Sequence, residues 1–342
     1  MTDPTVQTPG ISEQDADTRL AENHFDIEAL LAKADHRFEA GDHKASNSFY
    51  GAVLKYVQVN GSPSPAYAQE AERALAMIDH CRQLFHDHLQ NHLDSTGFTR
   101  SNRHPRFQKS LEMMLGERER EGTNRAYPQM PLVYYYPDIP YINFAETGGF
   151  AWRKELESKF PDMQAEAISL LNDNADFKPY ISKDEQRAQG DVHAMLENDD
   201  WSSLFLLENG VTNDANVELC PAISSATIDG LPLCRIGQRT PSVLLSLLRP
   251  GAHIPPHTGM LNCRHICHMP LIIPDGCGFR VGSETVEWKE GELLAFDDTV
   301  QHEAWNRGSE NRLVLIFDIW VPEITQVERQ QIAALFEAVD TY

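Results

Sequence analysis

The chain has 342 residues and a composition close to that of an average globular protein, with 41% hydrophobic and 23% charged residues. It contains 51 Asp and Glu residues against 29 Lys and Arg residues, which gives a formal net charge of -22. This charge argues against nucleic acid or an anionic membrane as a partner, because both attract proteins with a local excess of basic residues. The length predicts about two domains.

The first 22 residues are acidic and polar, and they lack both the basic start and the apolar run of a secretory signal. We therefore expect a disordered leader over residues 1–22 and a chain that begins where the sequence begins. No stretch approaches the length of a membrane-spanning helix, so we expect a cytoplasmic protein. The six cysteines show no regular spacing and are expected to be reduced thiols.

Residues 23–99 carry apolar side chains at helical spacing. One run from Ile27 to Phe38 and another from Ala45 to Tyr56 are separated by a Gly-Asp turn, which predicts a helical hairpin that resembles a tetratricopeptide unit. The segment from Tyr67 to Leu93 predicts a third, long helix. Such a module either packs without a partner or offers a docking surface for a protein or peptide.

Residues 100–133 are charged, then aromatic and rich in proline, and we expect a linker that lies over a folded surface. Residues 134–342 are expected to form the second domain. Within it, short β-branched or aromatic runs are separated by Gly, Pro or Asp. The expected strands are Ser242–Leu248, Asn262–Ile273, Phe279–Val281, Thr285–Trp288, Glu292–Phe296 and Arg312–Trp320, and a closing helix is expected over Ile324–Val339. Strands without intervening helices predict a sandwich, barrel or jelly roll, so the fold class is α+β with an N-terminal helical module.

Histidines in this strand-rich region mark the candidate site. His257 lies in a stretch from Arg249 to Gly259 that is rich in proline and glycine, which is typical of a rigid loop that holds a ligand side chain. His302 follows an apolar strand and the pair Asp297-Asp298. Two histidines in this order, followed by Arg312, resemble the pattern of non-haem Fe(II) oxygenases that use 2-oxoglutarate.

Those enzymes usually bind iron through two histidines and one carboxylate. Here Gly259 stands where the carboxylate is expected. With this departure, the sequence between Gln238 and Thr325 closely resembles the aspartyl/asparaginyl β-hydroxylase family. The shared motifs are Pro250-Gly251, Asn262-Cys263-Arg264, Leu271–Pro274, Trp288–Gly291, Phe296–Asp298, His302-Glu303, Trp305 and Trp320–Glu323. Some members also carry a tetratricopeptide-like region before the oxygenase domain.

The resemblance implies that His257 and His302 are catalytic and bind Fe(II), with water in place of the carboxylate. It also implies that the cosubstrate 2-oxoglutarate binds to Ser246, His268 and Arg312. The other cosubstrate is O2. The products would be a hydroxylated substrate, succinate and CO2.

The resemblance further implies that Arg264 faces the substrate, which would be an Asp or Asn residue or a related carboxylate-bearing molecule, either small or part of a peptide. Two positions depart from the family pattern. Ile266 stands where a second arginine is common, and Leu196 lies near the place of an arginine that helps hold the peptide in the animal enzyme.

Alternation along an extended strand places Arg264, Ile266 and His268 on one face, and Cys263, His265 and Cys267 on the other. This alternation disfavours a zinc cluster made of these cysteines and His268. We expect His265 and His253 to be structural. Asp297 and Asp298 are either capping acids or acceptors for the N–H of a ligand imidazole.

The main hypothesis is a 2-oxoglutarate-dependent hydroxylase. A halogenase is an alternative, because a small residue at the carboxylate position also leaves room for chloride. A non-catalytic helical-repeat binding protein is another, which the intact His257 and His302 argue against. In such an acidic chain, a dicarboxylate cosubstrate needs a local positive charge, and we expect Arg264, Arg312 and the iron to supply it.

Overall fold

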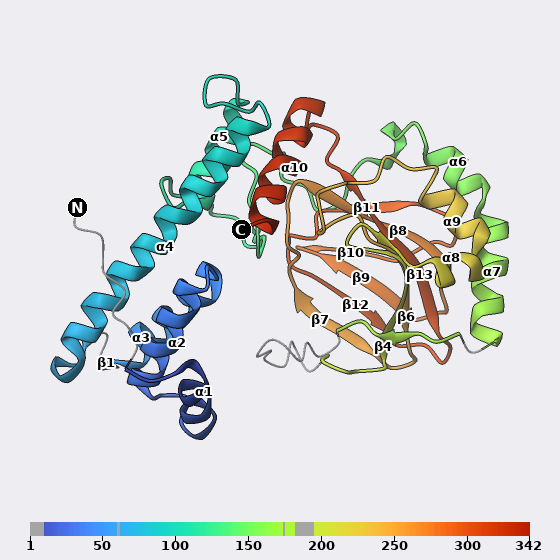
Figure 1. The fold of residues 1–342 in the computed structure, drawn as a ribbon. Coiled ribbons are helices and arrows are strands. Elements are labelled where there is room, and N and C mark those ends of the chain that lie inside the picture. The colour runs from blue at the N-terminus through green and yellow to red at the C-terminus, as the bar shows by residue number, and fades with distance from the viewer. Residues whose placement is uncertain (1–9, 60–61, 174, 182–194) are drawn as a thin grey trace. The chain divides into compact units, whose positions relative to one another are not determined.

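The computed structural model describes residues 10–59, 62–173, 175–181 and 195–342. It divides into two compact units, shown as ribbons in Figure 1. The first unit ends at His92 and also includes Tyr342, and the second runs from Leu93 to Thr341. The domain boundaries expected at residues 99 and 133 stay predictions. Within the described ranges, no helix combines the length and apolar character that a membrane crossing requires.

The first unit is helical. Its elements are α1 (Glu13–Glu22), α2 (Ile27–Glu39), α3 (His43–Tyr56), β1 (Gln58–Val59), β2 (Ser62–Pro63), η1 (Pro65–Tyr67) and most of α4 (Ala68–Ser95). The carboxylates of Asp26 and Asp42 cap α2 and α3 by accepting hydrogen bonds from the N–H groups of Ala29 and Ala45. The expected pair of helices and the long third helix are therefore present. Their likeness to a tetratricopeptide unit stays a prediction.

The expectation of a disordered leader is wrong for residues 13–22, because they form α1. The hydroxyl of Ser12 caps this helix by accepting from the N–H of Asp15. Ala16 is fully buried against Ala29 and Ala32 of α2, so small side chains on both helices let them pack closely. The rest of the expected leader, residues 1–9, lies outside the described residues.

The second unit is built on two antiparallel sheets. The larger sheet has the order β11 (Leu294–Phe296), β8 (Arg264–Ile272), β13 (Arg312–Trp320), β6 (Val243–Leu248), β4 (Trp201–Glu208) and β3 (Lys178–Pro179), with β5 (Val211–Thr212) paired to β4. The smaller sheet has the order β10 (Glu284–Val286), β9 (Cys277–Val281), β12 (His302–Asn306) and β7 (His253–His257). The chain crosses between the sheets as it runs from β6 to β13, and this pairing confirms the predicted jelly roll.

The larger sheet is buried on both faces. Along β8, Cys267, Met269 and Leu271 pack on the outer face against α6 (Arg153–Ser158), α7 (Phe160–Asn172) and α9 (Pro221–Thr227), which Figure 1 shows covering the sheet. Arg264, Ile266 and His268 line a cavity on the inner face, as strand alternation predicted. The remaining helices are α5 (Pro105–Met114), η2 (Thr147–Gly149), α8 (Asp214–Leu219) and α10 (Gln326–Asp340).

The structure also differs from the sequence-based expectation at several elements of the second unit. The stretch expected as a rigid loop around His257 contains β7, an edge strand of the smaller sheet, where prolines without an N–H are tolerated. Strands β12 and β4 were not expected. The expected linker contains α5, whose Phe107 and Leu111 are fully buried, so this part is packed into the second unit.

Candidate active site

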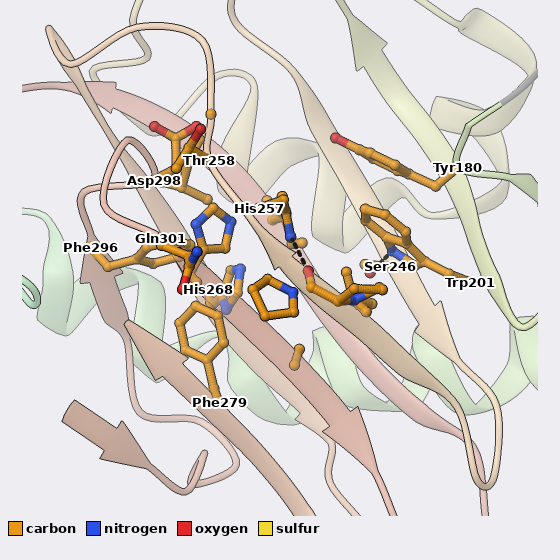
Figure 2. A pocket seen from close by; sticks show the side chains of 18 of the residues that line it. Tyr180, Trp201, Ser246, His257, Thr258, His268, Phe279, Phe296, Asp298 and Gln301 are labelled. Atoms are coloured by element: carbon orange, nitrogen blue, oxygen red, sulfur yellow. Dashed lines mark hydrogen bonds between the residues drawn. The ribbon is translucent and has the colours of Figure 1, made fainter. Parts of the chain in front are cut away.

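A cavity of about 660 Å³ opens between the two sheets. Its lining is mostly apolar, with several polar side chains among it. The described residues that line it are Leu132, Tyr180, Ile181, Met195, Trp201, Ser246, Ile254, Pro255, Pro256, His257, Thr258, Gly259, Met260, Arg264, Ile266, His268, Phe279, Phe296, Asp298, Gln301, His302, Ala304, Arg312 and Ile316. Figure 2 shows most of these side chains around the cavity.

His257 and His302 lie directly opposite each other on the paired strands β7 and β12. Their ring centroids are 4.1 Å apart. The Nδ1 atom of His257 is 2.7 Å from the carbonyl oxygen of Pro255, and the Nδ1 atom of His302 is 3.0 Å from that of Val300 (Figure 2 shows the first bond). Because a carbonyl can only accept, each Nδ1 carries a proton, and in its neutral form each ring has its lone pair on Nε2.

The protonation state of His302 suits a metal ligand. Burial, followed by the proximity of His257, lowers the pKa of His302 to about 3. The imidazole is therefore neutral near pH 7, which is the form that binds transition metals. Among the described residues, no group of three or more His, Cys, Asp and Glu side chains is placed to hold a metal ion, so this site offers two histidines.

Gly259 is tightly enclosed. Its N–H donates to the carbonyl oxygen of Asp298 at 2.6 Å, and a Cβ added to it would overlap the carboxylate of Asp298. The space that a side chain at this position would need is therefore already filled by the carboxylate of Asp298. The neighbouring Asp297 accepts from the N–H and hydroxyl of Thr299 at 2.9 and 2.6 Å, so it caps the turn that precedes His302.

Arg264 bridges two buried carboxylates. Its guanidinium nitrogens lie 3.1 Å from Asp298 Oδ2 and 3.2 Å from Asp318 Oδ2. Burial raises the pKa of both aspartates. Burial alone would lower the pKa of Arg264, but the two carboxylates raise it. The positive charge expected from Arg264 is thus compensated inside the protein.

Arg312 differs, because the described residues give it no carboxylate partner. It is buried, its Nη1 lies 3.2 Å from Ser246 Oγ, and its guanidinium lies 4.4 Å from the centre of the Trp288 ring. Its Nε has no hydrogen-bond partner among the described residues. Burial lowers the pKa of Arg312 to about 10, so the side chain stays charged near pH 7. A buried cation of this kind requires an anionic partner.

His268 and Ser246 offer two further hydrogen-bond donors near Arg312. The indole N–H of Trp288 donates to Nδ1 of His268 at 3.2 Å, so the proton of this neutral imidazole lies on Nε2. Burial, with help from the nearby Arg312 and His302, holds the pKa of His268 well below its usual range. Ser246 Oγ accepts from Arg312 and from the indole N–H of Trp201 at 3.2 Å, which leaves its own hydrogen to donate.

The structure therefore brings together every residue proposed from the sequence. These residues are Ser246, His257, Arg264, His268, His302 and Arg312. His253 and His265 do not line the cavity: His253 contacts Glu303 at 2.8 Å, and His265 is buried on the opposite face of its strand. Sequence reasoning missed the contacts of Trp201 and Trp288 with the site, since both tryptophans come from other strands or loops and no local pattern signals their partners.

Residues 157–322 match the family model described as aspartyl/asparaginyl beta-hydroxylase. The human aspartyl/asparaginyl beta-hydroxylase is 32% identical over 57% of this chain and 24% of its own length. An ornithine lipid ester-linked acyl 2-hydroxylase from Rhizobium tropici is 31% identical over 52% of this chain and 60% of its own length. The predicted resemblance is confirmed, and the chain spans about a quarter of the human relative's length.

One solved structure illustrates how far the structural likeness extends. A Pseudomonas putida prolyl-4-hydroxylase aligns with 47% of this chain and 88% of its own chain, at 18% identity and a TM-score of 0.29. This likeness is too low to indicate a function.

Proposed function

Because residues 157–322 match the model of the aspartyl/asparaginyl β-hydroxylase family, we propose that this domain is an Fe(II)- and 2-oxoglutarate-dependent hydroxylase. It would convert a substrate C–H bond, O2 and 2-oxoglutarate into an alcohol, succinate and CO2. The observation that best supports this function is the buried Arg312, without a carboxylate partner among the described residues, in the same cavity as the paired histidines His257 and His302.

The donor set fits Fe(II). His257 and His302 would hold the metal through Nε2, because the backbone carbonyls of Pro255 and Val300 fix the proton of each ring on Nδ1. Bound iron would supply the activation of O2 that the side chains of this protein cannot supply themselves. Besides the two histidines, the cavity would leave room for 2-oxoglutarate and O2. Asp298, which lies beside Gly259, would offer a hydrogen-bond acceptor to water in the cavity.

The cosubstrate fits the other end of the cavity. Arg312 would pair with the distal carboxylate of 2-oxoglutarate, since its planar guanidinium donates two parallel hydrogen bonds. The hydroxyl of Ser246 and Nε2–H of His268 would donate to the same carboxylate. Phe279 and Phe296 pack against His268, with ring centroids 5.0 and 4.9 Å away, and would exclude water from this end.

A hydroxylase is favoured over the two alternatives. A halogenase needs a place for chloride beside the histidines, and the carboxylate of Asp298, which lies against Gly259, would disfavour an anion there. A non-catalytic binding protein has no need for a buried arginine without a counter-ion. A docking role for the N-terminal helices stays a prediction.

The proposed substrate class follows from the family resemblance alone. It is an Asp or Asn residue, or a related carboxylate-bearing molecule, and Arg264 is the side chain expected to contact it. Arg264 does line the cavity, although Asp298 and Asp318 already compensate its charge.

The test uses the full chain, purified without oxygen. We expect it to bind Fe(II) and, with O2, to convert 2-oxoglutarate to succinate slowly even without substrate. His302→Ala should abolish both metal binding and succinate formation. Wild-type protein that binds no iron, or undiminished succinate formation by the variant, would refute the assignment.

A further inference from the structure

Segment 129–136 is bonded to the two stretches of chain that adjoin the paired histidines. The N–H of Leu132 donates to the carbonyl oxygen of Gly259 at 3.0 Å. The N–H of Met130 donates to the carbonyl oxygen of Thr299 at 2.7 Å. The first bond reaches the loop after β7, and the second reaches the turn before β12. The segment therefore connects the surroundings of one histidine to those of the other.

The side chain of Gln129 joins the same two places. Its Nε2 donates to Oδ2 of Asp297 at 2.5 Å, and its Oε1 lies 3.5 Å from Nδ2 of Asn262. Asp297 also accepts from the N–H and the hydroxyl of Thr299, so its carboxylate holds the turn before β12. The exposed fractions of Gln129, Asn262 and Asp297 are 6%, 1% and 2%. Water has little access to replace these contacts, so losing them would leave buried polar groups unpaired.

Asn262 is itself fixed by the same segment. Its Oδ1 accepts from the N–H of Tyr136 at 2.6 Å, and its Nδ2 donates to the carbonyl oxygen of Tyr136 at 2.8 Å. The loop after β7 is thus bonded to the segment at both Leu132 and Tyr136. Gln129 adds the link from this loop to Asp297.

The strand that carries His257 has little other support. Among the described strands, β7 lies at the edge of its sheet and pairs only with β12. Its two prolines also lack an N–H to donate. The described residues offer a metal ion two histidines, fewer ligands than a three-ligand site has to fix the geometry. The relative position of the two rings therefore depends on the contacts that hold the adjoining loop and turn.

From these contacts, and on the basis of the proposed iron-dependent function, we propose that Gln129 is a positioning residue of the metal site. It acts through Asp297 and Asn262, and it keeps His257 and His302 in the relative position that binds the metal. The segment precedes residues 157–322, which match the family model, so it lies outside that match.

The experiment measures the binding of Co(II) to the full chain, purified without metal, from the absorption of the bound ion. Gln129→Ala removes both side-chain contacts. We expect it to weaken Co(II) binding by about ten-fold, as the loss of a residue that orients metal ligands does. Gln129→Leu keeps a similar side-chain volume without a donor or an acceptor, so it should show the same loss. Wild-type affinity in Gln129→Leu would show that the hydrogen bonds are not the cause and would overturn the proposal.

Gln164 of α7 provides a matched control. Its Nε2 donates to the carbonyl oxygen of Leu271 at 2.8 Å and to Oε2 of Glu290 at 3.0 Å, so it also joins distant segments. Neither partner belongs to the loop after β7 or to the turn before β12. Gln164→Ala should lower the free energy of unfolding of the metal-free protein and leave Co(II) binding unchanged. A merely structural role of Gln129 predicts the same result for Gln129→Ala.

A double variant tests the path through Asp297. Asp297→Ala should itself weaken Co(II) binding. Adding Gln129→Ala should then weaken it by less than about two-fold more, because the two side chains act as a unit. Losses that multiply in full in the double variant would show that Gln129 does not act through Asp297, and would overturn the proposed path.

The outcomes separate this proposal from the proposed function. Equal Co(II) affinities for the wild type, Gln129→Ala and Gln164→Ala would overturn the positioning role and leave the hydroxylase standing. If the wild-type protein binds neither Co(II) nor Fe(II), the proposed metal site itself fails and the positioning role with it.

Discussion

The enclosure of Gly259 leads to a quantitative prediction about stability. In Gly259→Ala, the new methyl group would overlap the carboxylate of Asp298, which is held by Arg264 at 3.1 Å. Both side chains are buried, and moving the carboxylate aside would break its ion pair with Arg264. Overpacking a buried site costs about 1–3 kcal/mol. We therefore expect the variant to lose roughly 2 kcal/mol of the free energy of unfolding.

Urea unfolding followed by tryptophan fluorescence measures this loss. All 5 tryptophans lie in the second unit, so the signal reports on the unit that contains Gly259. Gly148→Ala is a suitable control, since an added Cβ at Gly148 meets no atom within 4 Å. It should change the free energy of unfolding by less than about 0.5 kcal/mol.

The same substitution in an Asp298→Ala variant tests whether the overlap with Asp298 causes the loss of stability. If the cost arises from overlap with Asp298, then Gly259→Ala should cost less than about 0.5 kcal/mol when Asp298→Ala is already present. The same cost in both backgrounds, or a cost equal to that of Gly148→Ala, would refute the close contact between Gly259 and Asp298.

Three further predictions concern the cavity and its strand. Arg312→Lys keeps the charge but loses the planar fork, so KM for 2-oxoglutarate in the succinate assay should rise by roughly ten- to a hundred-fold; an unchanged KM would contradict the proposed pairing. Trp288→Phe removes the hydrogen bond to Nδ1 of His268. Nitrogen NMR of that ring should then show a mixture of tautomers, and KM for 2-oxoglutarate should rise about five-fold. A single tautomer in the variant would contradict the proposed role of Trp288. Burial lowers the pKa of His265 to about 4, below the unfolded value near 6.5, so its contribution to stability is complete above pH 6.5 and falls by up to about 1.4 kcal/mol per pH unit towards pH 4. His265→Gln should flatten the pH dependence of the free energy of unfolding in this range, and an unchanged slope would show that another group causes it.

The sequence predicted the strands that form the centre of the larger sheet. Every residue of β6 from Val243 to Leu248 is buried, because helices cover one face and the cavity lies on the other, and such strands read as continuous apolar runs. Alternation along β8 also placed Arg264 and His268 on the inner face. These features depend on local pattern, which one sequence displays.

The features that could not be predicted depend on contacts between distant segments. The strand β7 contains two prolines and β12 carries His302 and Glu303, so neither resembles an apolar strand. The pairing of Arg264 with two buried carboxylates could not be predicted for another reason. Its partners Asp298 and Asp318 lie 34 and 54 residues away, and only the pairing of β8 with β13 and the turn before β12 brings them together.

The exposed side chains of Leu132, Met260 and Tyr180 form the mouth of the cavity, and a backbone hydrogen bond holds Leu132 in place. Leu132 exposes its side chain to water, yet its amide proton is held by the carbonyl oxygen of Gly259, a residue that lies far along the sequence in the loop after His257. This bond joins the mouth to that loop without belonging to either sheet. Exchange of the Leu132 amide with solvent deuterium therefore records opening of the mouth, whereas amides within β6 and β13 exchange when the sheets themselves separate.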